Sequence, residues 1–374
     1  MKKLFFLIPT LSGGGAEKVL VDLVNNLDKN KYDITVKTLL SGGVFEEKLN
    51  LNIKYSSVIN IKNNFLRKVF FYIISYILPS RMAYRIVADD EYDVEISYLE
   101  GVTTKLLIAS NNVNSKKIAF VHTDFSKNYD LFKIYKTYND CLNSYKLYDG
   151  VVFVSKQAKL GFENKIGELS RSIVLHNVID QKSINELSKK EITQKKSGLF
   201  TFISVGRLCT QKGFDRLIEA TSWLNDEKFD FEVWIVGEGP DRKELAALIE
   251  KYNLQNVKLL GFKKNPYKYI SAADMFICSS RVEGYSTVVT EALILQTPVV
   301  TTNCAGMDEI LDNGNYGMIT ENSTNGIYEG MKEILTDPNT YQMYFKLAQE
   351  RSKFFSIERN ISDYEKLFES GGTL

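Results

Sequence analysis

The chain has 374 residues and carries 47 Lys+Arg against 46 Asp+Glu, so its formal net charge is +1. A dedicated nucleic-acid-binding protein would usually be strongly basic, so we expect no nucleic-acid partner. Hydrophobic residues make up 44% of the chain. This excludes intrinsic disorder for most of its length and provides for the cores of two domains.

Cysteine and histidine usage argues against a disulfide framework and against a metal site. The four cysteines are far apart without any Cys-x-x-Cys, and there are only two histidines. Free thiols in a reducing cytosol fit this pattern better. The longest weakly polar stretch, Val69–Leu78, is about half of what a bilayer span needs. We therefore predict a cytoplasmic protein without a transmembrane helix.

The first half of the chain predicts the start of a parallel sheet. The apolar run Lys2–Thr10 predicts a strand, and a glycine-rich loop follows it. Ala16–Leu27 has its apolar residues on one helical face, and Tyr32–Leu40 alternates as a strand does. Strand, helix and strand in this order are typical of a βαβ unit. Further strands are predicted at Val94–Tyr98, Lys117–His122, Gly150–Val154 and Ser172–Leu175.

The same pattern restarts after Gln181–Ser197, a polar, lysine-rich stretch that we interpret as a connecting segment. Strands are predicted at Leu199–Val205, Phe231–Val236, Val257–Leu260, Met275–Ser279 and Pro298–Thr302, with helices between them. We therefore predict two doubly wound α/β domains, at residues 1–182 and 183–355. The final helix, 356–374, either caps the second domain or crosses back to complete the first.

Glycines follow the first strand in the loop Ser12-Gly13-Gly14-Gly15-Ala16. Such a loop at a helix start is either an anion site or a tight turn. A dinucleotide fingerprint fails here, because Lys18 stands where its third glycine belongs and no acid ends the second strand. The chain also lacks a Walker A motif. An NAD-dependent dehydrogenase is therefore disfavoured.

Charged residues follow two strands of the second half. Arg207 and Lys212 bracket a strand-to-helix loop, which suits a diphosphate, although such a pair is also common on solvated surfaces. Glu283 and Glu291 flank the start of an apolar helix, where Gly284 to Thr287 would present backbone N–H groups to an anion. The alternative is that both glutamates only stabilise the helix start.

These residues resemble a family of enzymes, the retaining GT-B glycosyltransferases of family four (glycosyl transferases group 1). The resemblance is carried by Gly13-Gly14-Gly15-Ala16-Glu17-Lys18, Val205-Gly206-Arg207 through Lys212-Gly213, Val236-Gly237-Glu238-Gly239-Pro240 and Glu283-x7-Glu291. It implies two Rossmann-like domains that face each other across a cleft. A nucleoside-diphosphate sugar would bind the second domain, and the first would hold the acceptor.

The resemblance also implies roles for single residues. Arg207, Lys212, Glu283 and His122 would form the catalytic set, with Glu283 near the 3-hydroxyl of the donor sugar and His122 beside that sugar. The donor would further contact Gly14, Gly15, Gly206, Phe262, Gly284, Tyr285, Ser286 and Glu291. Of these, Glu291 would hold the ribose and Phe262 would lie near the base.

The expected reaction is retaining transfer of a sugar, with a UDP-sugar favoured, to a saccharide acceptor. The acceptor would be lipid-linked, in bacterial surface polysaccharide or glycan assembly. We expect no cofactor and no metal, since two cations and a helix start can stabilise the leaving diphosphate and the chain has no Asp-x-Asp. The alternatives are a nucleotide-sugar epimerase of the same fold and a catalytically inert partner subunit.

The near-zero net charge hides one local excess. Residues 49–88 contain no Asp or Glu and carry six positive side chains among seven aromatic ones. The six cations are Lys54, Lys62, Arg67, Lys68, Arg81 and Arg85. We predict a basic, aromatic helix that binds an anionic membrane surface, which would place the protein peripherally on the inner face of the plasma membrane. The alternative is a core-packed helix with solvated cations.

Overall fold

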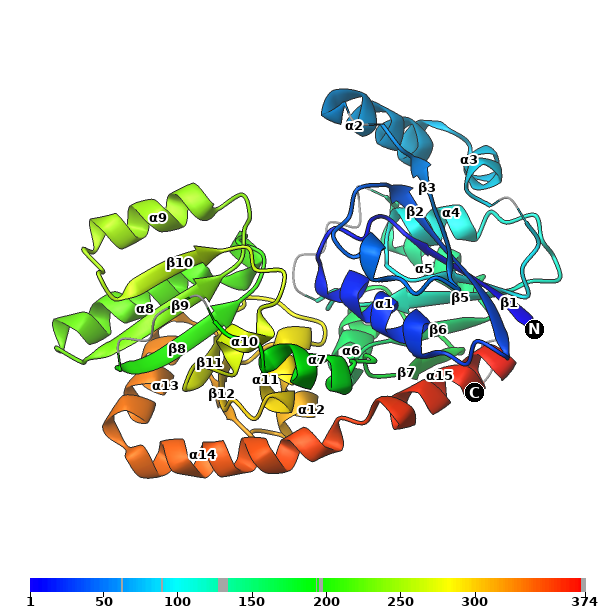
Figure 1. The fold of residues 1–374 in the computed structure, drawn as a ribbon. Coiled ribbons are helices and arrows are strands. Elements are labelled where there is room, and N and C mark those ends of the chain that lie inside the picture. The colour runs from blue at the N-terminus through cyan, green and yellow to red at the C-terminus, as the bar shows by residue number, and fades with distance from the viewer. Residues whose placement is uncertain (62, 89, 127–133, 193, 195–197, 371–374) are drawn as a thin grey trace. The chain divides into compact units, whose positions relative to one another are not determined.

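The computed structural model describes residues 1–374 except 62, 89, 127–133, 193, 195–197 and 371–374 (Figure 1). The chain forms two compact units, Met1–Val178 with Ile357–Leu374, and Ile179–Ser356. Each unit is a parallel β-sheet with helices on both faces, which confirms the predicted pair of doubly wound α/β domains. In the described part of the chain, no helix has the length and apolarity that a membrane span requires.

The first unit contains a seven-stranded sheet in the order β3-β2-β1-β4-β5-β6-β7. Its strands are β1 (Lys2–Ile8), β2 (Tyr32–Leu40), β3 (Lys54–Ile59), β4 (Val94–Ser97), β5 (Lys116–Val121), β6 (Gly150–Phe153) and β7 (Ser172–Val174). Alternate residues of β1 supply the two faces: Leu4 and Phe6 enter one core, and Phe5 and Leu7 enter the other. Both faces of the central strand are thus buried, as in parallel sheets generally.

Helices cover the two faces of this sheet (Figure 1). One core includes residues of α1 (Gly15–Asn26) and of the C-terminal α15 (Ile357–Ser370). The other includes residues of α3 (Ser80–Val87), α4 (Val102–Leu107), α5 (Tyr138–Lys146) and α6 (Lys156–Lys165). The Lys2 ammonium donates to the carbonyl of Phe368 at 2.8 Å, so α15 is joined to the first strand although it ends the chain.

The second unit contains a six-stranded sheet in the order β10-β9-β8-β11-β12-β13. Its strands are β8 (Phe200–Val205), β9 (Phe231–Val236), β10 (Val257–Gly261), β11 (Met275–Cys278), β12 (Val299–Thr302) and β13 (Met318–Thr320). One face packs on α7 (Gln181–Ser188), α10 (Tyr267–Ile270), α11 (Thr287–Ile294), α12 (Met307–Leu311) and α14 (Pro338–Arg351). The other packs on α8 (Phe214–Asp226), α9 (Arg242–Lys251) and α13 (Thr324–Thr336).

Two expectations from the sequence need correction. Residues 49–88 are not one helix: they contain β3, α2 (Asn64–Tyr72), a π-helical turn (Ile73–Ile77) and α3. The strand β3 escaped notice because it is an edge strand with polar serines in place of an apolar run. The segment Gln181–Ser197 also does more than connect, because Ile184 of α7 is buried in the core of the second unit.

Candidate functional site

The strand order of each sheet reverses once, between β1 and β4 in the first unit and between β8 and β11 in the second. In open α/β sheets, ligands bind at the carboxyl ends of the strands beside such a point. The charged residues singled out in the second unit follow β8 and β11, and the glycine loop of the first unit follows β1. Each set therefore lies at the edge of its own sheet where a ligand is expected.

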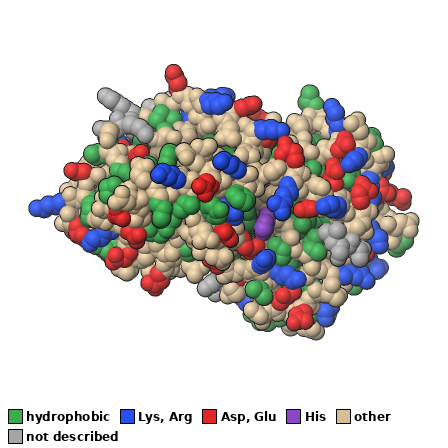
Figure 2. Space-filling model, turned by 90° about the horizontal axis from the view of Figure 1, so that it is seen from below, with side chains coloured by type: hydrophobic (Ala, Val, Ile, Leu, Met, Phe, Trp, Pro, Cys, Tyr) green, Lys and Arg blue, Asp and Glu red, His purple; other side chains and the backbone are tan. Residues whose placement is uncertain are grey.

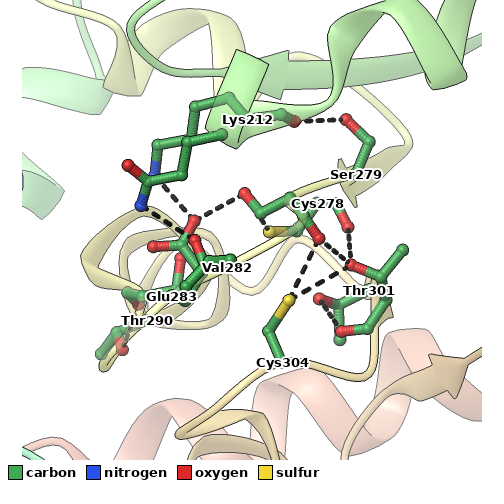
Figure 3. A network of polar contacts seen from close by, with 12 residues as sticks. Lys212, Cys278, Ser279, Val282, Glu283, Thr290, Thr301 and Cys304 are labelled. Atoms are coloured by element: carbon green, nitrogen blue, oxygen red, sulfur yellow. Dashed lines mark hydrogen bonds and ion pairs between the residues drawn. The ribbon is translucent and has the colours of Figure 1, made fainter. Parts of the chain in front are cut away.

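Lys212 and Glu283 meet at this edge of the second unit. Lys212 ends a one-turn 3-10 helix after β8, Glu283 follows β11, and Lys212 Nζ lies 2.7 Å from Glu283 Oε1 (Figure 3). The hydroxyl of Ser280 donates to the same oxygen at 2.6 Å. Burial alone would lower the pKa of Lys212, but the charge of Glu283 raises it above its ordinary value. Lys212 is therefore a fixed cation at neutral pH.

Backbone contacts hold the loops that carry this pair. Gly213 has φ +64°, and a Cβ there would lie 2.2 Å from the carbonyl oxygen of Ser279, so only glycine allows this approach. The Ser279 hydroxyl donates to the Lys212 carbonyl at 2.9 Å. The Ser280 carbonyl accepts from Thr302 Oγ1 at 2.6 Å and from Cys304 Sγ at 3.0 Å (Figure 3). The loops after β8, β11 and β12 are thus joined into one network.

Two arginines stabilise the same loops, Arg216 of α8 and Arg281 of the loop after β11, and sequence reasoning missed this role. Arg216 donates to the Ser279 carbonyl at 2.7 Å and to Asn322 Oδ1 at 2.9 Å. Arg281 binds both carboxylate oxygens of Asp215, at 2.7 and 2.5 Å. Their partners lie up to 106 residues away, so sequence spacing carries no signal for these contacts.

The start of α11 follows directly after Glu283. Ser286 precedes the helix but makes no side-chain cap, and its buried Oγ has no hydrogen-bond partner among the described residues. Glu291 lies in the second turn of α11 with 3% of its surface exposed. Gly306, at φ +79°, lets its loop approach the Gly284 carbonyl, since a Cβ would lie 2.6 Å from that oxygen. Beside these loops is a small pocket whose lining includes Lys212 and Ser280.

Of the other residues predicted in the second unit, Gly206 lies beside the ion pair, since a Cβ there would lie 3.5 Å from Lys212 Cγ. Arg207 is exposed and has no ion-pair partner within the described ranges. The N–H of Gly206 donates to the carbonyl of Val236 at 3.0 Å, and a Cβ on Gly237 would meet the Gly206 oxygen at 1.8 Å. Phe262 follows β10 with 55% of its surface exposed. The structure thus joins Lys212 and Glu283 directly and leaves Arg207 and Phe262 at the surface.

His122 of the first unit follows β5. Its backbone N–H donates to Glu100 Oε2 at 2.9 Å, and its ring centroid lies 5.1 Å from that of Tyr98. Burial lowers the pKa of His122 to about 4, so the imidazole is neutral at pH 7. Its Nε2 is buried and finds no hydrogen-bond partner in the part of the chain that is described. Glu100, which the sequence reading missed, is also buried, and burial raises its pKa.

The glycine loop of the first unit binds a carboxylate of its own helix. The N–H groups of Gly13 and Gly14 donate to Glu17 Oε2 at 2.7 and 2.5 Å, and the Thr10 hydroxyl donates to Oε1. Gly14 therefore offers no unengaged N–H in this arrangement, and a phosphate could use that group only by displacing Glu17. Gly15 is the first residue of α1.

Two doubly wound units with candidate residues at their strand ends define the class of the protein. Its fold is that of GT-B enzymes, as in Anabaena HepE, whose crystal structure contains UDP and glucose. The two chains are 18% identical with a TM-score of 0.76, and the match covers 99% of this chain and 100% of that one.

Residues 185–351 match the family described as glycosyl transferases group 1. A Campylobacter jejuni relative, N-acetylgalactosamine-N,N'-diacetylbacillosaminyl-diphospho-undecaprenol 4-alpha-N-acetylgalactosaminyltransferase, is 27% identical over 95% of this chain and 96% of its own length. An amylovoran biosynthesis glycosyltransferase of Erwinia amylovora is 26% identical over 96% and 97%. Residues 185–351 are therefore similar to the glycosyl transferases of group 1, and the chain is a glycosyltransferase.

Proposed function

We propose that the chain transfers a sugar, with retention of anomeric configuration and without a metal, from a UDP-sugar to a lipid-linked saccharide in bacterial polysaccharide or glycan assembly. The named relatives support this proposal, since one acts on a diphospho-undecaprenol acceptor and another serves amylovoran biosynthesis. The UDP in the HepE structure supports the choice of donor. The names of these relatives favour transfer over the epimerase and the inert subunit.

The observation that carries the proposal is the Lys212–Glu283 pair at the carboxyl ends of β8 and β11. Breaking the anomeric C–O bond leaves negative charge on the departing diphosphate, and a preorganised cation stabilises that charge. Lys212 would exchange its bond to Glu283 for one to the diphosphate. Glu283 would then be released to accept a hydrogen bond from the donor sugar.

The start of α11 would bind the same diphosphate. Backbone N–H groups at a helix N-terminus attract anions, and the buried Ser286 hydroxyl without a described partner is available to donate. Arg207 would contribute a second charge from the surface. His122, neutral at pH 7, would offer its buried Nε2 to the donor sugar as a hydrogen-bonding group and not as a cation.

A thermal-shift experiment tests the donor assignment. UDP should raise the melting temperature more than GDP or dTDP, because a ligand that binds only the folded state stabilises it. At a UDP concentration 100 times its Kd, the free energy of unfolding rises by about 2.7 kcal/mol. Equal shifts for all three nucleotides would leave no preference for uracil, and a larger shift with GDP would overturn the assignment.

Assays in excess EDTA test metal independence, since a metal-dependent enzyme would lose its activity.

Retention is best explained by attack on the same face that the diphosphate leaves, with a phosphate oxygen taking the acceptor proton. Retaining glycosidases instead use a carboxylate nucleophile, and Glu283 is the carboxylate placed for that role. Its bond to Lys212 makes it a poor nucleophile until the donor binds. We expect retained configuration by NMR without a covalent adduct, and a glycosyl group trapped on Glu283 would overturn this mechanism.

A further inference from the structure

The segment from α2 to α3 exposes an unusual concentration of large apolar side chains. Of the 20 exposed large hydrophobic residues in the described chain, nine lie between Phe65 and Ile86. We refer to the exposed side chains of α2, the π-helical turn and α3 as the α2–α3 surface. Isolated apolar residues are normal at a protein surface, but a contiguous group marks an interaction site.

The helix α2 presents its apolar side outward. None of its nine residues is buried. Phe65, Leu66, Val69 and Phe70 have the i, i+1, i+4, i+5 spacing that places them on one helical face, and they are 73%, 44%, 36% and 45% exposed. A surface helix of a soluble protein normally turns such a face toward the core. In Figure 1, α2 stands beyond the end of β3, away from the body of the first sheet.

The helix α3 is oriented by its buried side. Ala83 and Val87 enter the core, and the Tyr84 hydroxyl donates to the buried Glu95 Oε1 at 2.8 Å. The opposite side carries Arg81 and Arg85, four residues apart, beside Met82 and Ile86 with the same spacing. Met82 is 56% and Ile86 51% exposed. The outward side of α3 is therefore both cationic and apolar.

The charge of the α2–α3 surface is entirely positive. Residues 49–88 contain no acid, and Lys54 and Arg67 are engaged by Asp33 and by the Ser41 carbonyl. Lys68, Arg81 and Arg85 are exposed and have no ion-pair partner among the described residues. Elsewhere the two signs are mixed: Figure 2 shows acidic and basic side chains interspersed over the face seen from below.

We propose that the α2–α3 surface docks on an anionic lipid bilayer, with the aromatic and aliphatic side chains of α2 inserted at the headgroup level and Arg81 and Arg85 on the phosphates. An outward apolar helix face with adjoining cations is the pattern of an interfacial, membrane-lying helix. A second copy of the chain is a poorer occupant, because facing copies would bring the same arginines together without any acid between them.

Sedimentation with lipid vesicles tests the docking. The protein should pellet with vesicles of phosphatidylcholine containing about one third phosphatidylglycerol at low salt, and binding should weaken as salt screens the arginines. The double variant Arg81→Gln/Arg85→Gln should lose roughly 30-fold in affinity, at about fivefold per cation. Phe65→Ser/Phe70→Ser should weaken binding at high salt as well, because insertion of apolar groups is not screened.

Matched controls keep the test sharp. Lys29→Gln/Lys146→Gln removes two exposed cations of the same unit, and Leu147→Ser/Leu160→Ser removes two apolar residues that are 67% and 56% exposed. Both should bind vesicles as the wild type does. Equal loss in the controls, equal binding to neutral vesicles, or a dimer in solution that the phenylalanine variant abolishes would each overturn the proposal. No donor or acceptor is present, so this outcome is independent of the sugar-transfer proposal.

Discussion

The start of α1 in the first unit and the start of α11 in the second each follow a strand beside a reversal of strand order. The two helix starts differ in their hydrogen-bond partners. At α1, Glu17 accepts from the N–H groups of Gly13 and Gly14, so an internal carboxylate occupies the helix start. At α11, Ser286 makes no cap and its buried hydroxyl has no described partner. The internal carboxylate of the second site, Glu283, binds Lys212 instead.

This difference separates two loops that look alike in the sequence. In both, backbone N–H groups at the start of a helix that follows a strand predict an anion site. The structure fills that site with a side chain at α1, whereas at α11 the neighbouring carboxylate, Glu283, is paired with the partly buried Lys212. We therefore expect the donor diphosphate to depend mainly on the second unit.

The largest expected effect is the loss of sugar transfer in Lys212→Met. Losing one charge-assisted hydrogen bond to the diphosphate costs about 1.5–3 kcal/mol, which slows transfer roughly 10- to 200-fold. The measurement is kcat/KM for release of nucleoside diphosphate from the donor. The asymmetry would break if a comparable loss followed from replacing Glu17 while Lys212→Met stayed active.

Lys258→Met is the matched control for this variant. Lys258 lies 2.5 Å from Glu232, a carboxylate whose side chain is 6% exposed, in the same unit. Both variants leave a buried glutamate without its lysine, so both should lower the free energy of unfolding by about 1–3 kcal/mol. Only Lys212→Met should also lose activity. Equal activity losses would mean that the effect of Lys212→Met is one of folding.

The sequence predicts the fold class, but it does not predict the contacts that the candidate site residues make. Buried strands such as Tyr32–Leu40 and Phe231–Val236 were predicted with the bounds that the structure has, because their residues are apolar throughout or alternate. The strand β3 was missed for want of that pattern. Lys212 and Glu283 were singled out separately by their positions after strands. Their ion pair joins residues 71 apart, so no local sequence pattern predicts it. Glu100 and Arg216 were missed because burial and partners, not residue type, define their roles.

The second effect concerns the neutral imidazole of the first unit. Burial lowers the pKa of His122 to about 4 from its ordinary 6.5. The unfolded chain therefore binds a proton at this site below pH 6.5, and the folded chain does not until about pH 4. The stabilising contribution of a neutral His122 is complete above pH 6.5 and is lost as the pH falls toward 4, by about 1.4 kcal/mol per unit.

His122→Asn removes this dependence. Urea unfolding at pH 7, 6, 5 and 4.5 should show the free energy of unfolding of the wild type falling more steeply than that of the variant, by up to about 3 kcal/mol over the range. Parallel curves would mean that His122 titrates normally and is charged more readily than its burial indicates. Lys212 contributes no such slope near neutrality, because its pKa is raised, so the pH test separates the two regions.

The smallest effect tests the filled helix start directly. Glu17→Ala leaves the N–H groups of Gly13 and Gly14 without their acceptor and should cost about 1–2 kcal/mol of stability in urea unfolding. Glu244→Ala is the control, since Glu244 holds the same third position of α9 but is exposed. The Glu244→Ala control should cost only a few tenths of a kcal/mol through the helix dipole.

If the glycine loop also receives phosphate, Glu17→Ala vacates both N–H groups and UDP should bind more tightly. If the Glu17→Ala variant folds and its affinity for UDP is unchanged, then of the two helix starts only that of α11 binds the diphosphate.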